Sequence, residues 1–157
     1  GARHLLRSEP HSLDHLKDAR LFLETGLARL AAERADAAGI ASLKVRLDEH
    51  RAALARLEEF LDRDMAFHRE IALLTRNPIF PAIIEATFTW LAAYYRSLVR
   101  APGAEILTLA EHERIYQAIA RHDPDEAAAA MRDHLTRANE LYRRVSTDAP
   151  GAVQPLS

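Results

Sequence analysis

Apolar residues recur at steps of three and four along most of the chain, which is the spacing of helices with one buried face. The first such stripe predicts a helix over residues 12–35. Ser12 is its expected N-cap, and Asp36 with Gly39 marks its end. The stripe consists of Leu13, Leu16, Leu23, Leu27 and Leu30.

A second stripe runs from Ile40 to Thr75 with no interruption in its spacing. One continuous helix of that length would span roughly 50 Å, because each residue adds about 1.5 Å, and that is too long for a compact domain of this size. We therefore expect a break near Glu58–Phe60, followed by a third helix over about residues 60–75. This helix should end before Asn77-Pro78, because a residue that precedes proline is pushed out of the helical region.

Three more helices are expected, over about residues 78–99, 104–121 and 123–144. The first of them is apolar on more than one face, which is typical of a central helix or one at a subunit interface. Residues 1–11 and 146–157 contain prolines without helical spacing, so both ends are expected to be loose. The pattern predicts an all-α protein, an antiparallel bundle of about six helices, with one domain over residues 12–145.

Composition agrees with one helical domain and argues against several classes of function. The 157 residues are 48% hydrophobic and only 6% aromatic, with 5 glycines and 7 prolines. A net charge of -2 supplies no field that would draw this segment onto DNA. The chain has no cysteine and no apolar run of about 18 residues, so we expect a cytoplasmic protein without a membrane span. Because it begins Gly-Ala, we expect a fragment of a longer protein or a tag remnant.

Asp64 and His68 are the first candidates for chemistry. They stand four residues apart, so they project from one helical face on consecutive turns. That face also carries Phe67 and Ile71, which indicates that the pair points inward. A buried carboxylate is costly without a partner charge, so a cation is expected nearby.

His112 and His134 are the expected partners of that pair. Each lies 11 residues from Asp123, the centre of the turn between the last two predicted helices. In an antiparallel hairpin, equal distances from the turn place two side chains at the same height. Both histidines also lie on the apolar stripes of their helices, so both are expected to face the core.

Three imidazoles and one carboxylate suit a divalent metal ion, with zinc the first choice and nickel or manganese as alternatives. Such a site leaves positions open for water or a ligand oxygen. The alternative is that each inward histidine is an ordinary core residue hydrogen-bonded to backbone. His50 lies on the second stripe, but we leave it outside the predicted ligand set of Asp64, His68, His112 and His134.

Three segments resemble the FCD ligand-binding domain of GntR-family transcription regulators, in its metal-binding branch. They are ARLFLETGLARLAAERA (19–35), DMAFHREIALLTRNPIF (64–80) and EHERIYQAIARHDPDEAAAAMRDHL (111–135). The resemblance implies that Asp64, His68, His112 and His134 are the metal ligands. It also implies an effector-sensing role and a winged helix-turn-helix upstream, absent from this segment, that binds DNA. The family's usual glycine before Asn-Pro is Arg76 here.

Within this family, the stretches RNPIF and FTWLAAYY look closest to sialic-acid-responsive repressors. The resemblance implies a small acidic effector, either a carboxylated sugar or a short organic acid. A guanidinium near the metal would clamp its carboxylate. Arg20 is the main candidate, although it could instead be a surface arginine paired with Glu24. Arg96 is the second candidate, with a solvated helix end as its alternative.

A regulator of palindromic operators is expected to be a homodimer. Phe88 and Tyr95 could line the dimer contact, with core packing as the alternative account of the aromatic helix. Two other functions remain open: a metal-dependent hydrolase of the DinB-like helical type, and a purely structural metal. The hydrolase would need a general base, and we expect Glu70 and Glu111 to point away from the metal.

Overall fold

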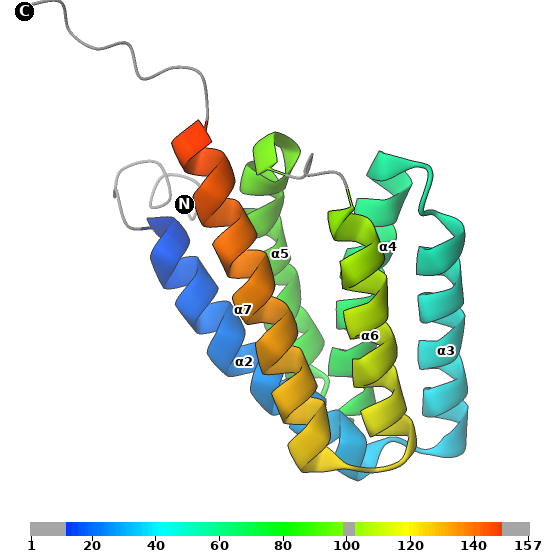
Figure 1. Ribbon diagram of the computed structural model, residues 1–157. Helices are drawn as coiled ribbons and strands as arrows, with labels where there is room; N and C mark the ends of the chain where they lie inside the picture. Colours follow the sequence, from blue (N-terminus) through cyan, green and yellow to red (C-terminus); the bar gives the residue numbers. More distant parts are fainter. Residues whose placement is uncertain (1–11, 99–102, 149–157) are drawn as a thin grey trace, which may run out of the picture.

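The computed structural model describes residues 12–98 and 103–148, and these form six helices without a strand. The all-α prediction is therefore confirmed. In chain order the helices are α2 (Ser12–Arg34), α3 (Ala37–Ala52), α4 (Leu57–Leu74), α5 (Ile79–Leu98), α6 (Ala104–Ala120) and α7 (Pro124–Asp148). Figure 1 shows them side by side as a bundle.

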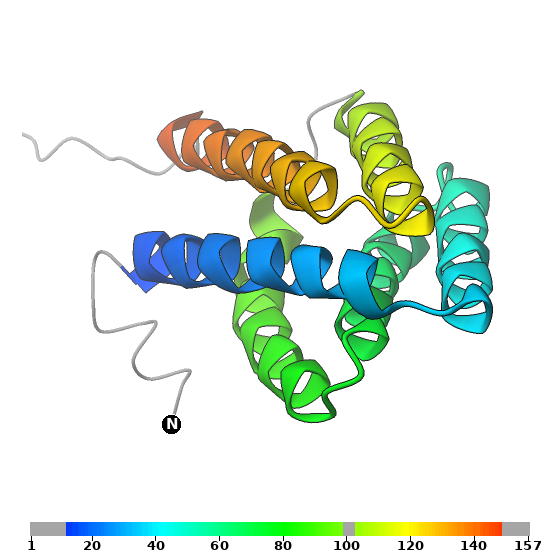
Figure 2. The ribbon, with the colours of Figure 1, turned by 90° about the horizontal axis from the view of Figure 1, so that it is seen from below.

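The helices pack so that segments distant in sequence surround one interior. α2 lies along α7, and α6 lies beside both α7 and α3. α3 forms one edge of the bundle, where it contacts α4 and α6 (Figures 1 and 2). The described part of the chain has no helix that is long and apolar enough to span a membrane.

Small residues allow α2 and α7 to approach closely. Ala28, Ala31 and Ala32 on α2 are fully buried, as is Ala127 on α7. Large side chains from α3 to α7 fill the rest of the core, where packing approaches crystal-like density. The largest of these are Leu43, Leu47, Phe67, Ile71, Ile84, Ile115, Ile119, Met131 and Leu135.

The break in the second stripe occurs earlier than predicted. α3 ends at Ala52 and α4 begins at Leu57, so residues 53–56 form the connection rather than Glu58–Phe60. Backbone bonds from Ala53 N to His50 O and from Arg56 N to Ala53 O make this turn. Because the apolar spacing continues unchanged through the turn, periodicity could not locate it.

The turn before α5 contains Arg76, at the position where the resemblance leads us to expect glycine. Arg76 has φ 60°, the left-handed region that L side chains rarely adopt. Its guanidinium is exposed and bonds the Asp36 carboxylate at 2.5 Å. Asn77 Oδ1 then accepts a hydrogen bond from Ile79 N at 3.0 Å, which starts α5. Arg76 therefore lies at the surface.

The C-terminal helix is longer than the sequence pattern indicated. α7 begins at Pro124, with Asp123 Oδ1 accepting from Glu126 N at 3.1 Å. It continues to Asp148, so residues 146–148, expected in a loose tail, are helical. The predicted loose segment 1–11 and residues 149–157 lie outside the described residues.

Two glycines offer a matched test of this packing. A Cβ added at Gly26 in α2 meets nothing within 4 Å, whereas one added at Gly39 in α3 would lie 2.6 Å from Leu74 Cδ2. We expect Gly26→Ala to raise the free energy of unfolding by about 0.5–1 kcal/mol, because alanine favours a helix. Gly39→Ala should lose that gain, because Leu74 is buried and must shift. Urea denaturation of both variants checks this, and equal stabilisation would contradict the α3–α4 packing.

Candidate metal centre

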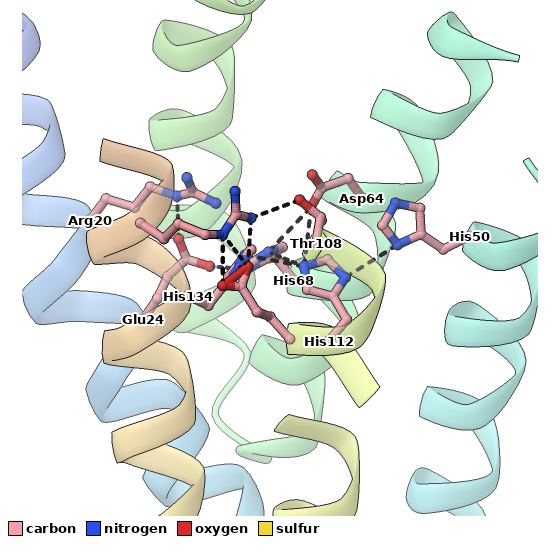
Figure 3. Close-up of polar contacts among 10 residues, drawn as sticks. Arg20, Glu24, His50, Asp64, His68, Thr108, His112 and His134 are labelled. Carbon is pink, nitrogen blue, oxygen red and sulfur yellow. Dashed lines mark hydrogen bonds and ion pairs between the residues drawn. The ribbon is translucent and has the colours of Figure 1, made fainter. Parts of the chain in front are cut away.

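The four predicted ligand residues come from three helices and meet in the core. α4 supplies Asp64 and His68 on consecutive turns, α6 supplies His112, and α7 supplies His134 (Figure 3). All four are buried; His112 is fully so and Asp64 is 7% exposed. The structure thus brings together the side chains that the hairpin and the four-residue spacing had indicated.

The Nε2 atoms of the three histidines point at one another. His112 Nε2 lies 3.1 Å from His68 Nε2 and 3.2 Å from His134 Nε2. Asp64 Oδ1 lies 3.3 Å from His68 Nε2 and 3.5 Å from His112 Nε2. Donors about 2.0–2.1 Å from a metal lie about 3.0 Å apart at right angles and about 3.4 Å apart at tetrahedral angles. The three imidazole nitrogens therefore fit one metal ion, with the Asp64 carboxylate beside those of His68 and His112.

Carboxylates hold two of the three imidazoles from behind through their Nδ1 atoms. His68 Nδ1 lies 2.5 Å from Glu24 Oε1, and His134 Nδ1 lies 3.0 Å from Glu111 Oε1. A carboxylate only accepts at neutral pH, so both Nδ1 atoms must carry a hydrogen and donate it. Their Nε2 atoms are then left to face the centre, as in metal sites whose histidines are oriented by carboxylates.

The centre attracts positive charge. Burial alone lowers the pKa of His68, but the Glu24 carboxylate and the hydrogen bond to Asp64 outweigh it and raise the pKa to about 9. Burial lowers the pKa of His112 well below its usual value and also lowers that of His134. Without a metal His68 therefore carries a second hydrogen and a positive charge, and a divalent cation would replace that added proton.

The carboxylates around the centre stay ionised although they are buried. Burial alone raises the pKa of Asp64, but its hydrogen bond with His68 and the charge of His112 lower it well below normal. Burial alone would also raise the pKa of Glu24, but the charges of Arg20 and His68 lower it to about 2. Glu24 is paired with the buried Arg20, so the Asp64 carboxylate is the negative group that favours a cation at the centre.

Arg20 lies behind Glu24 and is buried, at 4% exposure. Its Nε donates to Glu24 Oε2, and its guanidinium carbon lies 5.9 Å from the centroid of the Phe88 ring. The pairing with Glu24 that the spacing suggested is present, but the surface location is wrong. The side chain of Arg96, the second predicted effector residue, lies outside the described residues.

Glu111 was expected to point away from the metal, and it contacts the His134 nitrogen that faces away from the centre. It accepts from His134 and is held by both a hydrogen bond and an ion pair with Arg137, whose Nε lies 2.7 Å from each carboxylate oxygen. Arg137 also donates to Thr108 Oγ1 at 3.0 Å. Sequence reasoning missed Glu24 and Arg137; the i,i+3 spacing of His134 and Arg137 was the only signal for the latter.

His50 also belongs to this region, although it was left outside the predicted set. It is fully buried on α3, and its Nδ1 lies 3.2 Å from His112 Nδ1. Its position on the apolar stripe was the available signal. Burial lowers the pKa of His50 to about 4, so this imidazole is neutral.

Phe88 packs in the core of the domain. It is 3% exposed, belongs to the main core cluster, and its ring centroid lies 6.2 Å from that of His68. The core-packing account of this residue is therefore correct. The side chain of Tyr95 lies outside the described residues.

Comparison with known proteins identifies the family. Residues 15–137 match the FCD domain. The chain belongs to the FCD-domain family. This match confirms the resemblance that the DxxFH, Asn-Pro and MRDHL segments carried, and it spans all four candidate ligands of this FCD domain.

Among curated proteins, this FCD domain is similar to transcriptional repressors. It is 35% identical over 144 residues to the HTH-type transcriptional repressor NanR of Cronobacter sakazakii, a match that covers 88% of this chain and 54% of that protein. The corresponding figures for NanR of Edwardsiella tarda are 38%, 90% and 55%. The chain therefore spans about half the length of the curated relatives it matches.

A solved structure shows the same fold as this FCD domain. Escherichia coli McbR/YncC superposes with a TM-score of 0.78 at 16% identity, covering 87% of this chain and 66% of that one. At this identity the likeness supports the all-helical architecture alone. Evidence on the function of this FCD domain comes from its own site and its repressor relatives.

The ligand role of His134 in this FCD domain can be tested directly. His134→Ala should abolish stoichiometric binding of zinc, because it removes one of three inward nitrogens from a buried site. His122→Ala is the matched control, since His122 is exposed, lies outside the centre and bonds the Ala32 carbonyl oxygen through Nδ1. Metal content after dialysis against zinc is measured by inductively coupled plasma mass spectrometry. Equal zinc in both variants would remove His134 from the ligand set.

Proposed function

We propose that this FCD domain is the effector sensor of a GntR-family transcription repressor. Asp64, His68, His112 and His134 would hold a divalent metal ion, with zinc the first choice and nickel or manganese as alternatives. The observation that supports this most is the convergence of three Nε2 atoms, with the imidazoles of His68 and His134 held by carboxylates through Nδ1. Separate core histidines would have no reason to share that orientation.

The chemistry of the centre favours a carboxylate-bearing effector. A bound divalent cation would supply a Lewis acid that attracts anionic oxygen. Arg20, buried beside Glu24, places a permanent positive charge at the same end of the site, and a guanidinium can bind a carboxylate in a bidentate manner. We infer that Arg20 helps to orient the effector.

Among such acids we propose sialic acid or another acidic sugar, with short organic acids as the broader class. This rests on the likeness of the RNPIF and FTWLAAYY stretches to sialic-acid-responsive repressors and on the identity of 35–38% with proteins named NanR. DNA binding would belong to a winged helix-turn-helix upstream of this segment, since the net charge here is -2. Operator symmetry favours a homodimer.

The regulator is favoured over a hydrolase by a specific observation. Glu111 is the carboxylate nearest to the role of a general base, yet its oxygens are occupied by His134 and Arg137. Burial would raise the pKa of Glu111, but the hydrogen bonds from those two residues lower it, so it is a poor proton acceptor. The relatives are named transcriptional repressors, which also favours a regulator.

Effector binding is tested by thermal shift with a panel of acidic sugars and hydroxy acids, first with zinc and then after chelation. A ligand of the folded domain raises its apparent stability, and here the shift should require the metal. Neutral sugars of similar size are the control for nonspecific effects. A shift of equal size in chelated protein would contradict metal-assisted capture.

Arg20→Ala should weaken the binding of the best acid by about 1.5–3 kcal/mol, the range for a hydrogen bond to a charged group. Isothermal titration calorimetry measures both zinc and acid affinity in the same variant. Arg137→Ala is a comparison variant, since Arg137 contacts Glu111 and Thr108. Unchanged acid affinity in Arg20→Ala would show that Arg20 only balances the charge of Glu24.

A further inference from the structure

His50 is a buried histidine that provides no candidate ligand, yet it contacts the metal centre. It lies on α3, the edge helix that contributes none of the four ligand residues. Its Nδ1 atom is 3.2 Å from His112 Nδ1, and Figure 3 shows it behind His112 on the side away from the other ligands. Its ring packs on Phe60, with centroids 4.1 Å apart.

The hydrogen-bonding needs of His112 give this contact a specific role. His112 is fully buried, and its Nε2 faces the centre. A neutral imidazole that uses one nitrogen lone pair for a metal must carry its hydrogen on the other nitrogen. The hydrogen on His112 Nδ1 therefore needs an acceptor, and His50 Nδ1 lies where Glu24 and Glu111 lie for the other two histidines.

A purely space-filling role does not explain the chemistry of His50. Its Nε2 is buried without a hydrogen-bond partner in the described structure, which is unfavourable for a polar atom. An apolar residue on this stripe would avoid that cost. The contact between the two Nδ1 atoms is what an apolar residue could not provide.

Resting on the metal site of the proposed function, we propose that His50 is a positioning residue that accepts the Nδ1 hydrogen of His112 and so presents His112 Nε2 to the metal. His50 then has its own hydrogen on Nε2, beside Phe60. His112 is the ligand with an imidazole behind it, while its two neighbours have carboxylates. The metal centre thereby includes α3.

Two substitutions separate this role from packing. His50→Phe keeps an aromatic ring against Phe60 but removes the acceptor. His50→Asn loses ring volume but places a carbonyl oxygen close to the position of Nδ1. We expect His50→Phe to weaken zinc affinity by about 10- to 100-fold, the usual effect of losing such a partner, and His50→Asn to restore most of it. Competition with a chromophoric chelator measures both affinities.

Cobalt substitution reports on geometry independently of affinity. The visible d–d spectrum of the cobalt-loaded protein should change in His50→Phe and return toward that of the unsubstituted protein in His50→Asn. A spectrum and a zinc affinity that are unchanged in His50→Phe would overturn the proposal. So would an affinity that follows ring volume, with His50→Asn the weaker binder.

The tautomer itself is measured in the unsubstituted, metal-free protein by nitrogen-15 NMR of the imidazoles, which does not depend on any variant folding. We expect the hydrogen of His112 on Nδ1 and that of His50 on Nε2. The opposite assignment would overturn the role of His50. If the protein bound no metal while His112 showed the expected tautomer, the proposed function would fail and the positioning contact would stand.

Discussion

Three imidazole nitrogens and a carboxylate oxygen lie close together in the interior of this bundle. Their lone pairs require a positive charge between them, and the surrounding side chains are arranged to favour that charge. Lone pairs about 3 Å apart repel one another, and the low polarity of the interior strengthens that repulsion. A positive charge at the centre turns it into attraction. Without a metal this charge is a proton on His68, whose pKa is about 9. Glu24 and Glu111, which form an outer shell, hold two imidazoles with their Nε2 atoms toward the centre, so a positive charge there is favoured with or without a metal.

The packing of the helices depends on bringing these polar atoms together as well as on apolar burial. Residues of the centre and its outer shell come from α2, α3, α4, α6 and α7, so the helices must keep a fixed register for the atoms to meet. Glu24 on α2 reaches His68 on α4, while buried alanines on α2 leave room for α7 to pack on the same helix. Breaking one buried pair would leave an uncompensated charge, which costs more than the pair contributes when intact.

The inner residues were predictable from sequence because they depend on local periodicity. Asp64 and His68 share a helical face through their spacing, and His112 and His134 share a height through a short hairpin. Glu24, His50 and Arg137 depend on how helices distant in sequence are rotated against each other, which spacing within one helix does not determine. The turn at residues 53–56 could not be located from the sequence for a related reason. The apolar stripe runs through it unbroken, and the turn contains no glycine or proline.

The outer shell also suggests how a ligand at the centre would reach the rest of the molecule. A close-packed interior does not deform continuously, so a displaced side chain moves the helix that carries it. Arg20 and Glu24 connect the centre to α2, while His134 and Arg137 connect it to α7, and these two helices lie against each other. An acid that drew Arg20 away from Glu24 would alter the charge behind His68 and the packing of α2 on α7 together. The size of that response is limited by how much better the acid binds one arrangement than the other.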